Sequence, residues 1–261
     1  DVVLGFGGYI TAPAGVVAAL LGKPLFLHEQ NAIAGLSNRV LSKLARRSFS
    51  AYPQALEGAQ WVGNPLRDAF LQQATPAQRF EGRTGPLRVL VVGGSLGAQA
   101  LNDTVPQALA RLPAQSRPHV LHQSGEKHMT ALQDAYRQAG VTAELTPFID
   151  DTARAFAEAD VVIARAGAST VTELAAVGAA AVLVPFPHAV DDHQTHNARF
   201  LVDADAAWLM PQAQLTPQAL ADLIAQMNRD DLKQRAERAH AVRKTDAVAQ
   251  LVQACIDEVR P

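Results

Sequence analysis

Two glycine-rich segments follow apolar runs and carry residue types that bind phosphate and sugar groups. The first, RVLVVGGSLGAQALN, places Gly93, Gly94, Ser95 and Gly97 between an expected strand and an expected helix. Glycine lets the backbone approach a ligand closely, and the following helix offers unpaired N–H groups and a positive dipole end. The spacing matches neither the dinucleotide motif G-x-G-x-x-G nor a Walker loop. This segment alone leaves a phosphate loop and a plain tight turn with a serine cap both open.

The second segment, RAGASTVTEL at 165–174, follows the apolar run DVVIA. Thr170 and Glu173 have capping-box spacing, so a structural role at the start of a helix is one interpretation. The Glu173 carboxylate could also accept hydrogen bonds from both hydroxyls of a ribose, which no neutral side chain does in the same way. Because strand ends along one sheet edge meet at one crevice, both segments can face the same ligand.

A third segment, PFPHAVDDHQTHNA at 185–198, is rich in hydrogen-bond donors and acceptors. Within nine residues it holds three histidines, two aspartates and one glutamine. A metal site is one interpretation. However, Pro185 and Pro187 favour a loop, and no His-x-x-x-His spacing on a helix supports zinc. A cluster of this kind also suits the hydroxyl groups of a sugar.

Other expected strands end in polar or glycine-rich residues as well. Residues 28–31, HEQN, end a strand that should be buried, and their desolvation is costly unless they face a cleft. The segment PFIDD at 147–151 leaves a strand with an aspartate that can cap the next helix. GFGGYITAP places Gly5, Gly7 and Gly8 after the first strand.

Short β-branched runs alternate with longer Ala/Leu-rich periodic segments along almost the whole chain. This alternation predicts an α/β protein with βαβ units and parallel sheets, and the continuous apolar runs predict strands buried on both faces. The expected strands are Val2–Leu4, Leu25–His28, Ser48–Ala51, Trp61–Val62, Arg88–Val92, His119–Gln123, Glu144–Thr146, Val161–Ala164, Ala181–Val184 and Ala207–Met210. The expected helices include Gly35–Arg46, Ala98–Leu112, Lys127–Ala139, Val171–Val177 and His193–Val202.

The composition predicts two domains joined by a linker. Residues 71–86, LQQATPAQRFEGRTGP, are polar, hold two prolines and two glycines, and lack hydrophobic periodicity. Residues 87–261, with helices closing the chain, have the size of one doubly wound domain. Residues 1–70 are too short for a full domain and are expected to be the rear part of one. Because the chain opens inside a strand, we expect a fragment without its N-terminal part.

Bulk composition excludes several classes of protein. The 261 residues are 48% hydrophobic and 18% charged, which is typical of globular domains. The net charge of −2 does not indicate a nucleic-acid partner. One cysteine, Cys255, leaves no disulfide framework and no cysteine metal site. The longest apolar candidate for a membrane span, residues 10–27, is interrupted by proline, glycine and lysine, and no signal peptide is visible.

Taken together and in order, these motifs resemble those of the MurG family of bacterial glycosyltransferases, over residues 4–197. The motifs are GFGGYITAP, HEQNAIAGLSN, VGNPLR, VVGGSLGAQALN, FIDD, RAGASTVTELAAVG and VPFPHAVDDHQTHNA. The resemblance implies the GT-B fold, in which two Rossmann-like domains face each other across a cleft, with the N-terminal domain incomplete here. Family members usually carry an earlier glycine-rich loop with a histidine, which is absent from this chain.

The resemblance also implies individual roles. Ser95 and Arg67 would lie at the donor diphosphate, and Ile149 would read the uracil edge through its backbone. Glu173 would bind the ribose, and Asn31 would reach the donor sugar. The complete set of implied donor-binding residues is Asn31, Arg67, Ser95, Ile149, Ala168, Ser169, Thr170, Val171, Thr172, Glu173, His193 and Gln194. The implied phosphate loops contain Gly5, Gly7, Gly8, Gly93, Gly94 and Gly97.

The implied reaction is inverting transfer of N-acetylglucosamine from UDP-GlcNAc to the C4 hydroxyl of the muramyl sugar of lipid I. Its product, lipid II, serves peptidoglycan synthesis and hence cell shape and division. We expect no metal or other cofactor, because helix N–H groups and Arg67 can stabilise the leaving diphosphate. His28 and Glu29 are candidates for the general base. A chain without the earlier loop is expected to bind donor but to turn over poorly.

A polyprenyl-linked acceptor implies peripheral attachment to the anionic cytoplasmic face of the inner membrane. YITAPAGVVAALLGK at 9–23 offers an apolar segment, although an ordinary buried helix fits it equally. Arg39, Lys43 and Arg46, spaced i, i+4 and i+7, form a basic stripe that could meet anionic lipid or simply face solvent.

Three alternatives remain beside this interpretation. One is another GT-B enzyme, such as a lipid glucosyltransferase or a sugar-nucleotide epimerase. A second is a donor-binding subunit that needs a partner for the acceptor half. A nicotinamide-dependent oxidoreductase is disfavoured by the glycine spacing.

Overall fold

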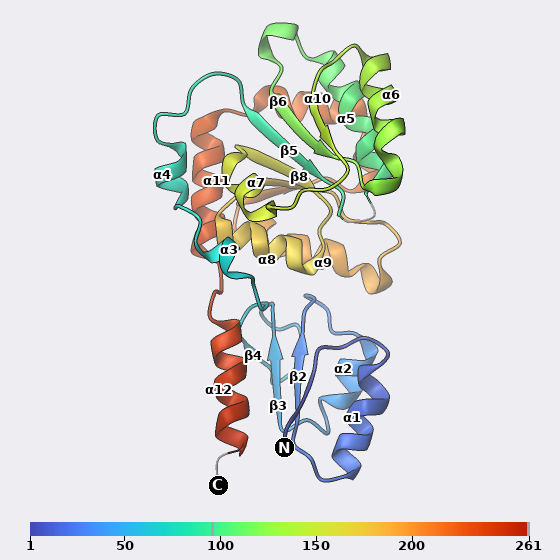
Figure 1. The fold of residues 1–261 in the computed structure, drawn as a ribbon, viewed down its shortest axis with the longest axis vertical. Helices are drawn as coiled ribbons and strands as arrows, with labels where there is room; N and C mark the ends of the chain where they lie inside the picture. Colours follow the sequence, from blue (N-terminus) through green and yellow to red (C-terminus); the bar gives the residue numbers. More distant parts are fainter. Residues whose placement is uncertain (95–96, 260–261) are drawn as a thin grey trace.

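The computed structural model describes residues 1–94 and 97–259, which form two parallel β-sheets one above the other (Figure 1). The lower sheet contains β1 (Val3–Gly5), β2 (Leu25–Glu29), β3 (Arg47–Ser50) and β4 (Gln60–Trp61). The upper sheet contains β5 (Arg88–Val92), β6 (His119–Gln123), β7 (Glu144–Thr146), β8 (Val161–Ala164), β9 (Ala181–Leu183) and β10 (Ala207–Leu209). We call these sheets, with the helices that cover them, the N-terminal and C-terminal units.

The helices connect and cover these strands. They are α1 (Thr11–Leu20), α2 (Leu36–Leu41), α3 (Asp68–Leu71), α4 (Pro76–Phe80), α5 (Gln99–Arg111), α6 (Met129–Ala139), α7 (Thr152–Glu158), α8 (Ala168–Val177), α9 (His193–Val202), α10 (Pro217–Gln226), α11 (Arg229–Ala241) and α12 (Ala247–Val259). No helix among residues 1–94 and 97–259 is long and apolar enough to cross a membrane.

The upper sheet has the strand order β10-β9-β8-β5-β6-β7. Strands β6 and β7 are therefore added on one side of β5, and β8, β9 and β10 are added on its other side. Val92 and Ala164, the last residues of β5 and β8, are register partners. In open parallel sheets ligands bind at this reversal point, beyond the carboxyl ends of the strands. The topology thus places the loops after β5 and β8 side by side.

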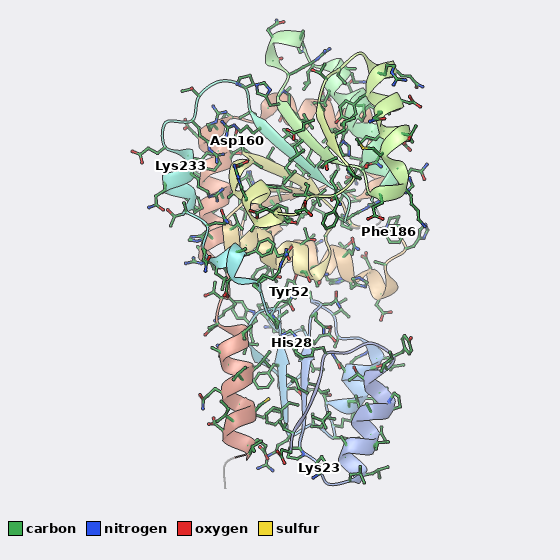
Figure 2. All side chains as sticks on the ribbon, in the orientation of Figure 1. Lys23, His28, Tyr52, Asp160, Phe186 and Lys233 are labelled. Atoms are coloured by element: carbon green, nitrogen blue, oxygen red, sulfur yellow. The ribbon has the colours of Figure 1, made fainter. Side chains whose placement is uncertain are left out.

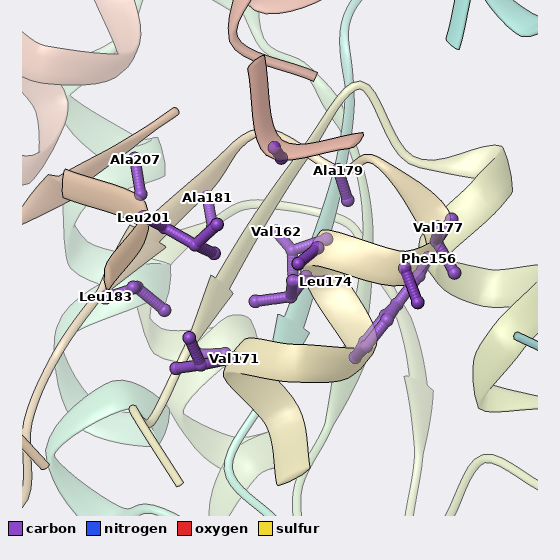
Figure 3. Packing of buried hydrophobic residues seen from close by; sticks show 14 of the residues in the cluster. Phe156, Val162, Val171, Leu174, Val177, Ala179, Ala181, Leu183, Leu201 and Ala207 are labelled. Carbon is purple, nitrogen blue, oxygen red and sulfur yellow. The ribbon is translucent and has the colours of Figure 1, made fainter. Parts of the chain in front are cut away.

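Both faces of the upper sheet are buried, which explains its continuous apolar strands. Alternate residues point to opposite faces, so Val161 and Ile163 pack on the side of α5 and α10, whereas Val162 and Ala164 pack on the side of α7, α8 and α9. Figure 3 shows the second cluster, in which Leu174 lies beside Val162. Each fully buried Val or Leu side chain contributes about 1.5–3 kcal/mol. The expected two-sided burial is confirmed.

The lower sheet has the order β1-β2-β3-β4, all parallel. Leu25, Leu27 and Leu41 pack between this sheet and α2. The opposite face is covered by α12, whose Leu251 and Ala254 contact the same cluster as Phe26 and Phe49. The last helix therefore crosses back to the N-terminal unit (Figure 1). This corrects the expectation that all closing helices belong to the domain at 87–261, because the apolar stripe of α12 complements the face that α1 and α2 leave open.

The expected linker at 71–86 is packed against the C-terminal unit. Its helix α4 begins with a capping box formed by Thr75 and Gln78, and Phe80 is buried in the core. Arg79 donates to the carbonyls of Ala157 and Val177 at 2.7 and 2.8 Å. The polar residues that indicated a free linker are instead used in capping and in ion pairs, so this segment is attached to the upper sheet.

The sequence placed most elements correctly in the C-terminal unit. Strands β5, β6, β7 and β8 and helix α9 have the expected limits. The expected helix at 35–46 is wrong in length, because α2 ends at Leu41 and turns follow it. The basic stripe is therefore divided. Arg46 forms an ion pair with Glu258 of α12 at 2.7 Å, whereas Arg39 lies 4.0 Å from Asp191 of the C-terminal unit.

Candidate functional site

The loop after β5 requires glycine at two described positions. A Cβ on Gly93 would lie 2.3 Å from the Ala98 backbone nitrogen, and one on Gly97 would lie 2.1 Å from the Ser124 carbonyl oxygen. Gly94 and Gly97 also adopt positive φ angles of 83° and 75°. Helix α5 follows without a side-chain cap, so its first N–H groups are available to an anion. Ser95 lies outside the described residues.

The loop after β8 leads into α8 through Gly167, which occupies the N-cap position without a side-chain hydrogen bond. The capping box of Thr170 and Glu173 is therefore not formed, and that structural interpretation is wrong. Helix α8 begins at Ala168, three residues before the expected start. Ser169 is exposed and Thr170 half-buried beside the uncapped end. This helix start offers N–H groups and hydroxyls at the reversal point of the sheet.

Glu173 and Arg67 are brought together from distant parts of the sequence. Glu173 is half-buried one turn into α8. Burial raises the pKa of Glu173, and the positive charge of Arg67 opposes this shift. Arg67 precedes α3 and lies over the ring of Phe70, 5.0 Å from its centroid. A carboxylate that can accept from hydroxyl groups and a guanidinium that can bind phosphate therefore interact electrostatically.

Three other residues that were predicted to bind the donor do not present exposed side chains beside Glu173. Val171 is fully buried in the core cluster, so its side chain is removed from the candidate site. Thr172 is also buried and donates to the carbonyls of Ala168 and Ser169. Val171 lies on the face of α8 that packs on the sheet, whereas Thr172 is covered from the N-terminal unit, whose Asn64 donates to the Thr172 hydroxyl at 3.4 Å. Ile149 lies before α7 and lines a cavity of about 1030 Å³ beside β5, β6 and β7.

We call residues 185–194 the sugar loop. Asp191 and Asp192 have positive φ angles of 53° and 51°, which are uncommon outside glycine and occur at strained functional loops. The Gln194 side-chain oxygen accepts a 2.9 Å hydrogen bond from the Phe186 backbone, which leaves the amide NH₂ as the group that can donate to a ligand. His193 begins α9.

Arg165, which the sequence interpretation passed over, supports the sugar loop. Its guanidinium donates to the carbonyls of Val184 and Pro185 and to Gln212, at 2.7–3.2 Å. It also lies over the ring of Phe186, with 5.5 Å between the guanidinium carbon and the ring centroid. The sequence feature that could have identified Arg165 is its position directly after the buried strand β8.

The two units meet through polar side chains that the sequence interpretation also missed. Asn197 of α9 accepts a 2.7 Å hydrogen bond from the Ala32 backbone and donates to Asn31 and to the Ala166 carbonyl at 3.2 Å. Asn31 is thus held against the loop after β8 through Asn197. Asn197 is completely buried on an otherwise apolar face of α9. An asparagine on the apolar face of a predicted helix is the sequence feature that could have identified it.

Tyr52 and Asn64 form a second part of this contact, and Figure 2 labels Tyr52 where the two units meet. The Tyr52 hydroxyl donates to the Ala168 carbonyl at 2.9 Å, and the Asn64 side chain donates to the Thr172 hydroxyl of α8 at 3.4 Å. The ring of Tyr52 packs edge-on against Phe200 with the centroids 5.3 Å apart. The start of α8 is therefore fixed from the N-terminal unit as well as from its own sheet.

His28 and Glu29 are buried and used within the fold, so the structure does not favour either as the general base. His28 Nε2 lies 2.8 Å from the Gly63 carbonyl, and burial lowers the pKa of the imidazole. Glu29 accepts from the Asn31 and Gly35 backbones and from Asn38, at 2.8–3.2 Å. We infer a positioning role for both, because Glu29 holds the loop that contains Asn31 and His28 contacts the Gly63 carbonyl.

The first glycine-rich segment has mixed roles. Gly5 belongs to β1, where a Cβ would lie 2.6 Å from Thr11, so packing requires this glycine and its assignment to a phosphate loop is corrected. Gly7 and Gly8 form the turn before α1 with φ angles of 80° and 78°. The Gly7 carbonyl accepts from the Thr11 hydroxyl, and Gln30 donates to the Phe6 carbonyl. This turn therefore adjoins the HEQN strand end.

The residues at 188–196 are arranged around the backbone of their own loop. His196 Nδ1 lies 3.1 Å from the Asp192 carbonyl, and the Asp192 carboxylate accepts from Thr195 at 2.7 Å. Across residues 1–94 and 97–259, no group of three or more His, Cys, Asp or Glu residues is arranged as a metal site.

Comparison with protein families gives two matches along the chain. The model of the Glycosyltransferase family 28 C-terminal domain matches residues 88–253, and that of the Glycosyltransferase family 28 N-terminal domain matches residues 1–50.

Curated proteins extend the similarity over the whole chain. It is 61% identical over 260 residues to the UDP-N-acetylglucosamine--N-acetylmuramyl-(pentapeptide) pyrophosphoryl-undecaprenol N-acetylglucosamine transferase of Albidiferax ferrireducens, covering 100% of this chain and 67% of that protein. The protein of the same name from Paracidovorax citrulli is 61% identical over 255 residues, covering 98% of this chain and 72% of its own length.

Comparison with solved structures gives the same family. The crystal structure of Acinetobacter baumannii MurG is similar with a TM-score of 0.90 and 41% identity, over 98% of this chain and 73% of that chain. UDP-GlcNAc 2-epimerase from Neisseria meningitidis, bound to UDP-GlcNAc, has a TM-score of 0.66 at 10% identity, over 98% of this chain and 76% of that chain. The second match concerns the fold alone.

Proposed function

Since the chain belongs to glycosyltransferase family 28 and has its GT-B fold, we propose that it transfers N-acetylglucosamine from UDP-GlcNAc to the C4 hydroxyl of the muramyl sugar of lipid I, forming lipid II. The observation that carries the proposal is the uncapped start of α8 at the reversal point of the sheet, together with Glu173 on the same helix, on which the positive charge of Arg67 acts. This arrangement offers a carboxylate for a ribose, on α8, and positive charge for a diphosphate, from the residue before α3.

The donor is held by residues of both units in this proposal. Glu173 accepts hydrogen bonds from the ribose hydroxyls, while Ser169 and Thr170 lie at the phosphates with Arg67. Gln194 donates to the sugar from the sugar loop, with His193 beside it, and Asn31 approaches from the N-terminal unit. Ser95 and the glycines after β5 complete the phosphate contacts, and Ile149 reads the uracil through its backbone.

Charge stabilisation is the chemical contribution of this site. As the acceptor hydroxyl attacks the anomeric carbon, negative charge grows on the departing diphosphate. The N-termini of α5 and α8 present oriented N–H groups without side-chain caps, and the Arg67 guanidinium adds a full positive charge. These groups are held by packing before the reaction starts, so little reorganisation is needed when the charge develops.

Calorimetric titration of this chain with UDP-GlcNAc and with UDP tests the proposal. We expect both to bind at one site, with NAD as a control that does not compete. We expect UDP to bind as well as UDP-GlcNAc, because the uracil, the ribose and the diphosphate, which both ligands share, supply most of the contacts. Competition by NAD, or no heat of binding with UDP-GlcNAc from the folded chain, would contradict the assignment of this site.

Donor affinity is expected to depend on pH through Glu173. Only the ionised carboxylate accepts hydrogen bonds from both ribose hydroxyls, so affinity should fall as the pH drops through its pKa. Burial raises that pKa above 4.5, so the fall should begin at a higher pH than for an ordinary glutamate. In Arg67→Ala the midpoint should move higher still, because Arg67 holds the pKa down. Titrations of UDP-GlcNAc from pH 4 to 8, roughly the range in which a carboxyl group and its shifted form ionise, measure both midpoints.

For membrane attachment we infer that the exposed face of α1 and α2 lies on an anionic bilayer. On α1, Val17 and Leu20 are 53% and 80% exposed, and on α2, Leu36 and Val40 are 69% and 53% exposed. Lys23 follows α1 and adds positive charge at the edge of this apolar surface. We expect Leu20→Glu to reduce sedimentation with phosphatidylglycerol vesicles. Equal sedimentation of the variant and the unchanged chain would refute this contact.

A further inference from the structure

The N-terminal unit contains a cavity that none of the proposed donor contacts uses. It has a volume of about 580 Å³, within the usual range for ligand sites of roughly 300–1,000 Å³. Its lining comes from the loop at 32–34, from α2 with the turn after it, and from the loop at 54–57. The floor is apolar, with Ala34, Ala55 and Leu56 buried.

The rim of the cavity is charged and amphoteric. Arg39 and Lys43 supply two positive charges from the α2 side, and Glu57 supplies one negative charge from the opposite loop. All three side chains are exposed, and Gln54 and Ser42 add neutral polar groups between them. An apolar floor with a rim of both signs suits a peptide, which has apolar side chains and a carboxylate, better than it suits a polyanion.

The cavity adjoins the place where sugar transfer would occur. Ala32, which lines it, donates its backbone N–H to Asn197 of the C-terminal unit at 2.7 Å. Arg39, on its rim, lies 4.0 Å from Asp191 of the sugar loop. The neighbouring residue Asn31 is the proposed contact to the donor sugar from this unit. A group attached close to the reacting hydroxyl of an acceptor would therefore reach the cavity directly.

Muramyl sugars carry such a group. The relatives are named for an N-acetylmuramyl-(pentapeptide) acceptor, and muramic acid bears its peptide through a lactyl ether on C3, the carbon next to the C4 hydroxyl. We propose that this cavity binds the peptide of the acceptor, with a peptide carboxylate at Lys43 and Arg39 and apolar side chains on the floor. The inference rests on the proposed function, which it extends from the donor to the acceptor.

A lipid headgroup is the competing occupant, and the geometry disfavours it. The exposed apolar residues of the α2 region, Leu36, Val40 and Leu44, do not line the cavity. The proposed bilayer contact and the cavity therefore use different sides of α2. The negative charge of Glu57 on the rim would also repel a phosphate.

The test is a titration of this chain, in the presence of UDP, with a soluble N-acetylmuramyl pentapeptide that lacks diphosphate and lipid. Lys43→Glu is expected to weaken its binding roughly five- to tenfold, the scale of an exposed charge contact that is also reversed in sign. The matched control Lys127→Glu, which reverses an exposed lysine outside the cavity, should leave it unchanged. Melting temperatures of both variants should equal that of the unchanged chain, because both lysines are exposed.

A second comparison isolates the carboxylate contact. Amidation of the C-terminal carboxylate of the peptide should weaken binding to the unchanged chain and have little further effect on Lys43→Glu, since the two changes remove one interaction. Equal effects of amidation on both chains would overturn the assignment. So would a loss of vesicle binding in Lys43→Glu with peptide affinity unchanged, which would mean that the lysine serves lipid.

Failure of this inference and failure of the proposed function give different results. A chain that binds UDP-GlcNAc but no muramyl peptide retains the proposed donor site and loses the peptide cavity. A chain that binds the peptide but not UDP-GlcNAc retains the cavity and loses the proposed transfer.

Discussion

Replacement of Glu173 by glutamine is expected to weaken UDP-GlcNAc binding roughly ten- to hundredfold, the scale of about 1.5–3 kcal/mol for hydrogen bonds to a charged group. Glutamine has nearly the same shape but only one acceptor oxygen and no charge. It cannot accept from both ribose hydroxyls as a carboxylate does. The loss should be similar for UDP, because the ribose is common to both ligands.

The same variant should not lose stability, and this separates a binding role from a structural one. Burial raises the pKa of Glu173 in the folded chain despite Arg67, so at neutral pH the charged form favours the unfolded state. Removing the charge is therefore expected to leave the melting temperature unchanged or slightly higher, as is common for residues kept for function.

Calorimetry and thermal unfolding measure the two effects. Glu158→Gln is the matched control, since Glu158 is an exposed glutamate of the same unit, paired with Arg154 on α7. Its donor affinity should equal that of the unchanged chain. A folded Glu173→Gln chain with unchanged affinity would remove Glu173 from the donor site.

The largest effect on stability is expected for Asp160→Asn, with a loss of about 3–5 kcal/mol, the usual result of removing one partner from a buried ion pair. The Asp160 side chain is completely buried, and its two oxygens pair with Arg83 at 2.7 Å and Arg229 at 3.1 Å (Figure 2). It also accepts from the Arg88 backbone at 2.9 Å. Asparagine would leave two largely buried guanidinium groups without a countercharge.

This effect should depend on pH in a defined direction. Burial alone raises the pKa of Asp160, but the hydrogen bonds from the Arg88 backbone, Arg229 and Arg83 outweigh it, and the pKa lies below its ordinary value of 3.8. A carboxyl group with a lowered folded pKa stabilises the fold above its unfolded pKa and loses that contribution as the pH falls through the folded one. The difference between the two chains should therefore be full above pH 3.8 and shrink below it.

Urea unfolding at several pH values measures this difference in the free energy of unfolding. Asp134→Asn serves as the control, because Asp134 forms an ion pair of the same 2.7 Å length with Arg137 on the surface. Its cost should stay below about 1 kcal/mol. If both variants lost the same free energy of unfolding, burial would not be the reason why the Asp160 ion pairs stabilise the fold.

The local pattern of residues determined much of the fold by itself. Strands β5 and β8 were predicted to the residue because their continuous apolar runs, RVLVV and VVIA, fit a sheet buried on both faces. The glycine-rich loop after β5 was also predicted from local sequence, and close approaches at Gly93 and Gly97 exclude any side chain there. Glu173 and Arg67 were chosen from motifs through a family resemblance, and the structure brings them together.

Only the tertiary structure decided which polar residues face outward and which connect the two units. His28 and Glu29 looked reactive in the sequence, but the fold buries both, places His28 Nε2 against the Gly63 carbonyl and engages the Glu29 carboxylate with the Gly35 backbone. Asn197 looked ordinary and proved to join Asn31 to the loop after β8.

The placement of the last helix and of the segment at 71–86 was also beyond local sequence. Both depend on surfaces that form only after distant strands have paired, namely the open face of the lower sheet for α12 and the buried Asp160 for Arg83. Propensity and periodicity act over one or two turns of chain. Contacts between residues 69 to 190 positions apart, such as Arg229 with Asp160 and Gln60 with Gln250, are decided by packing alone.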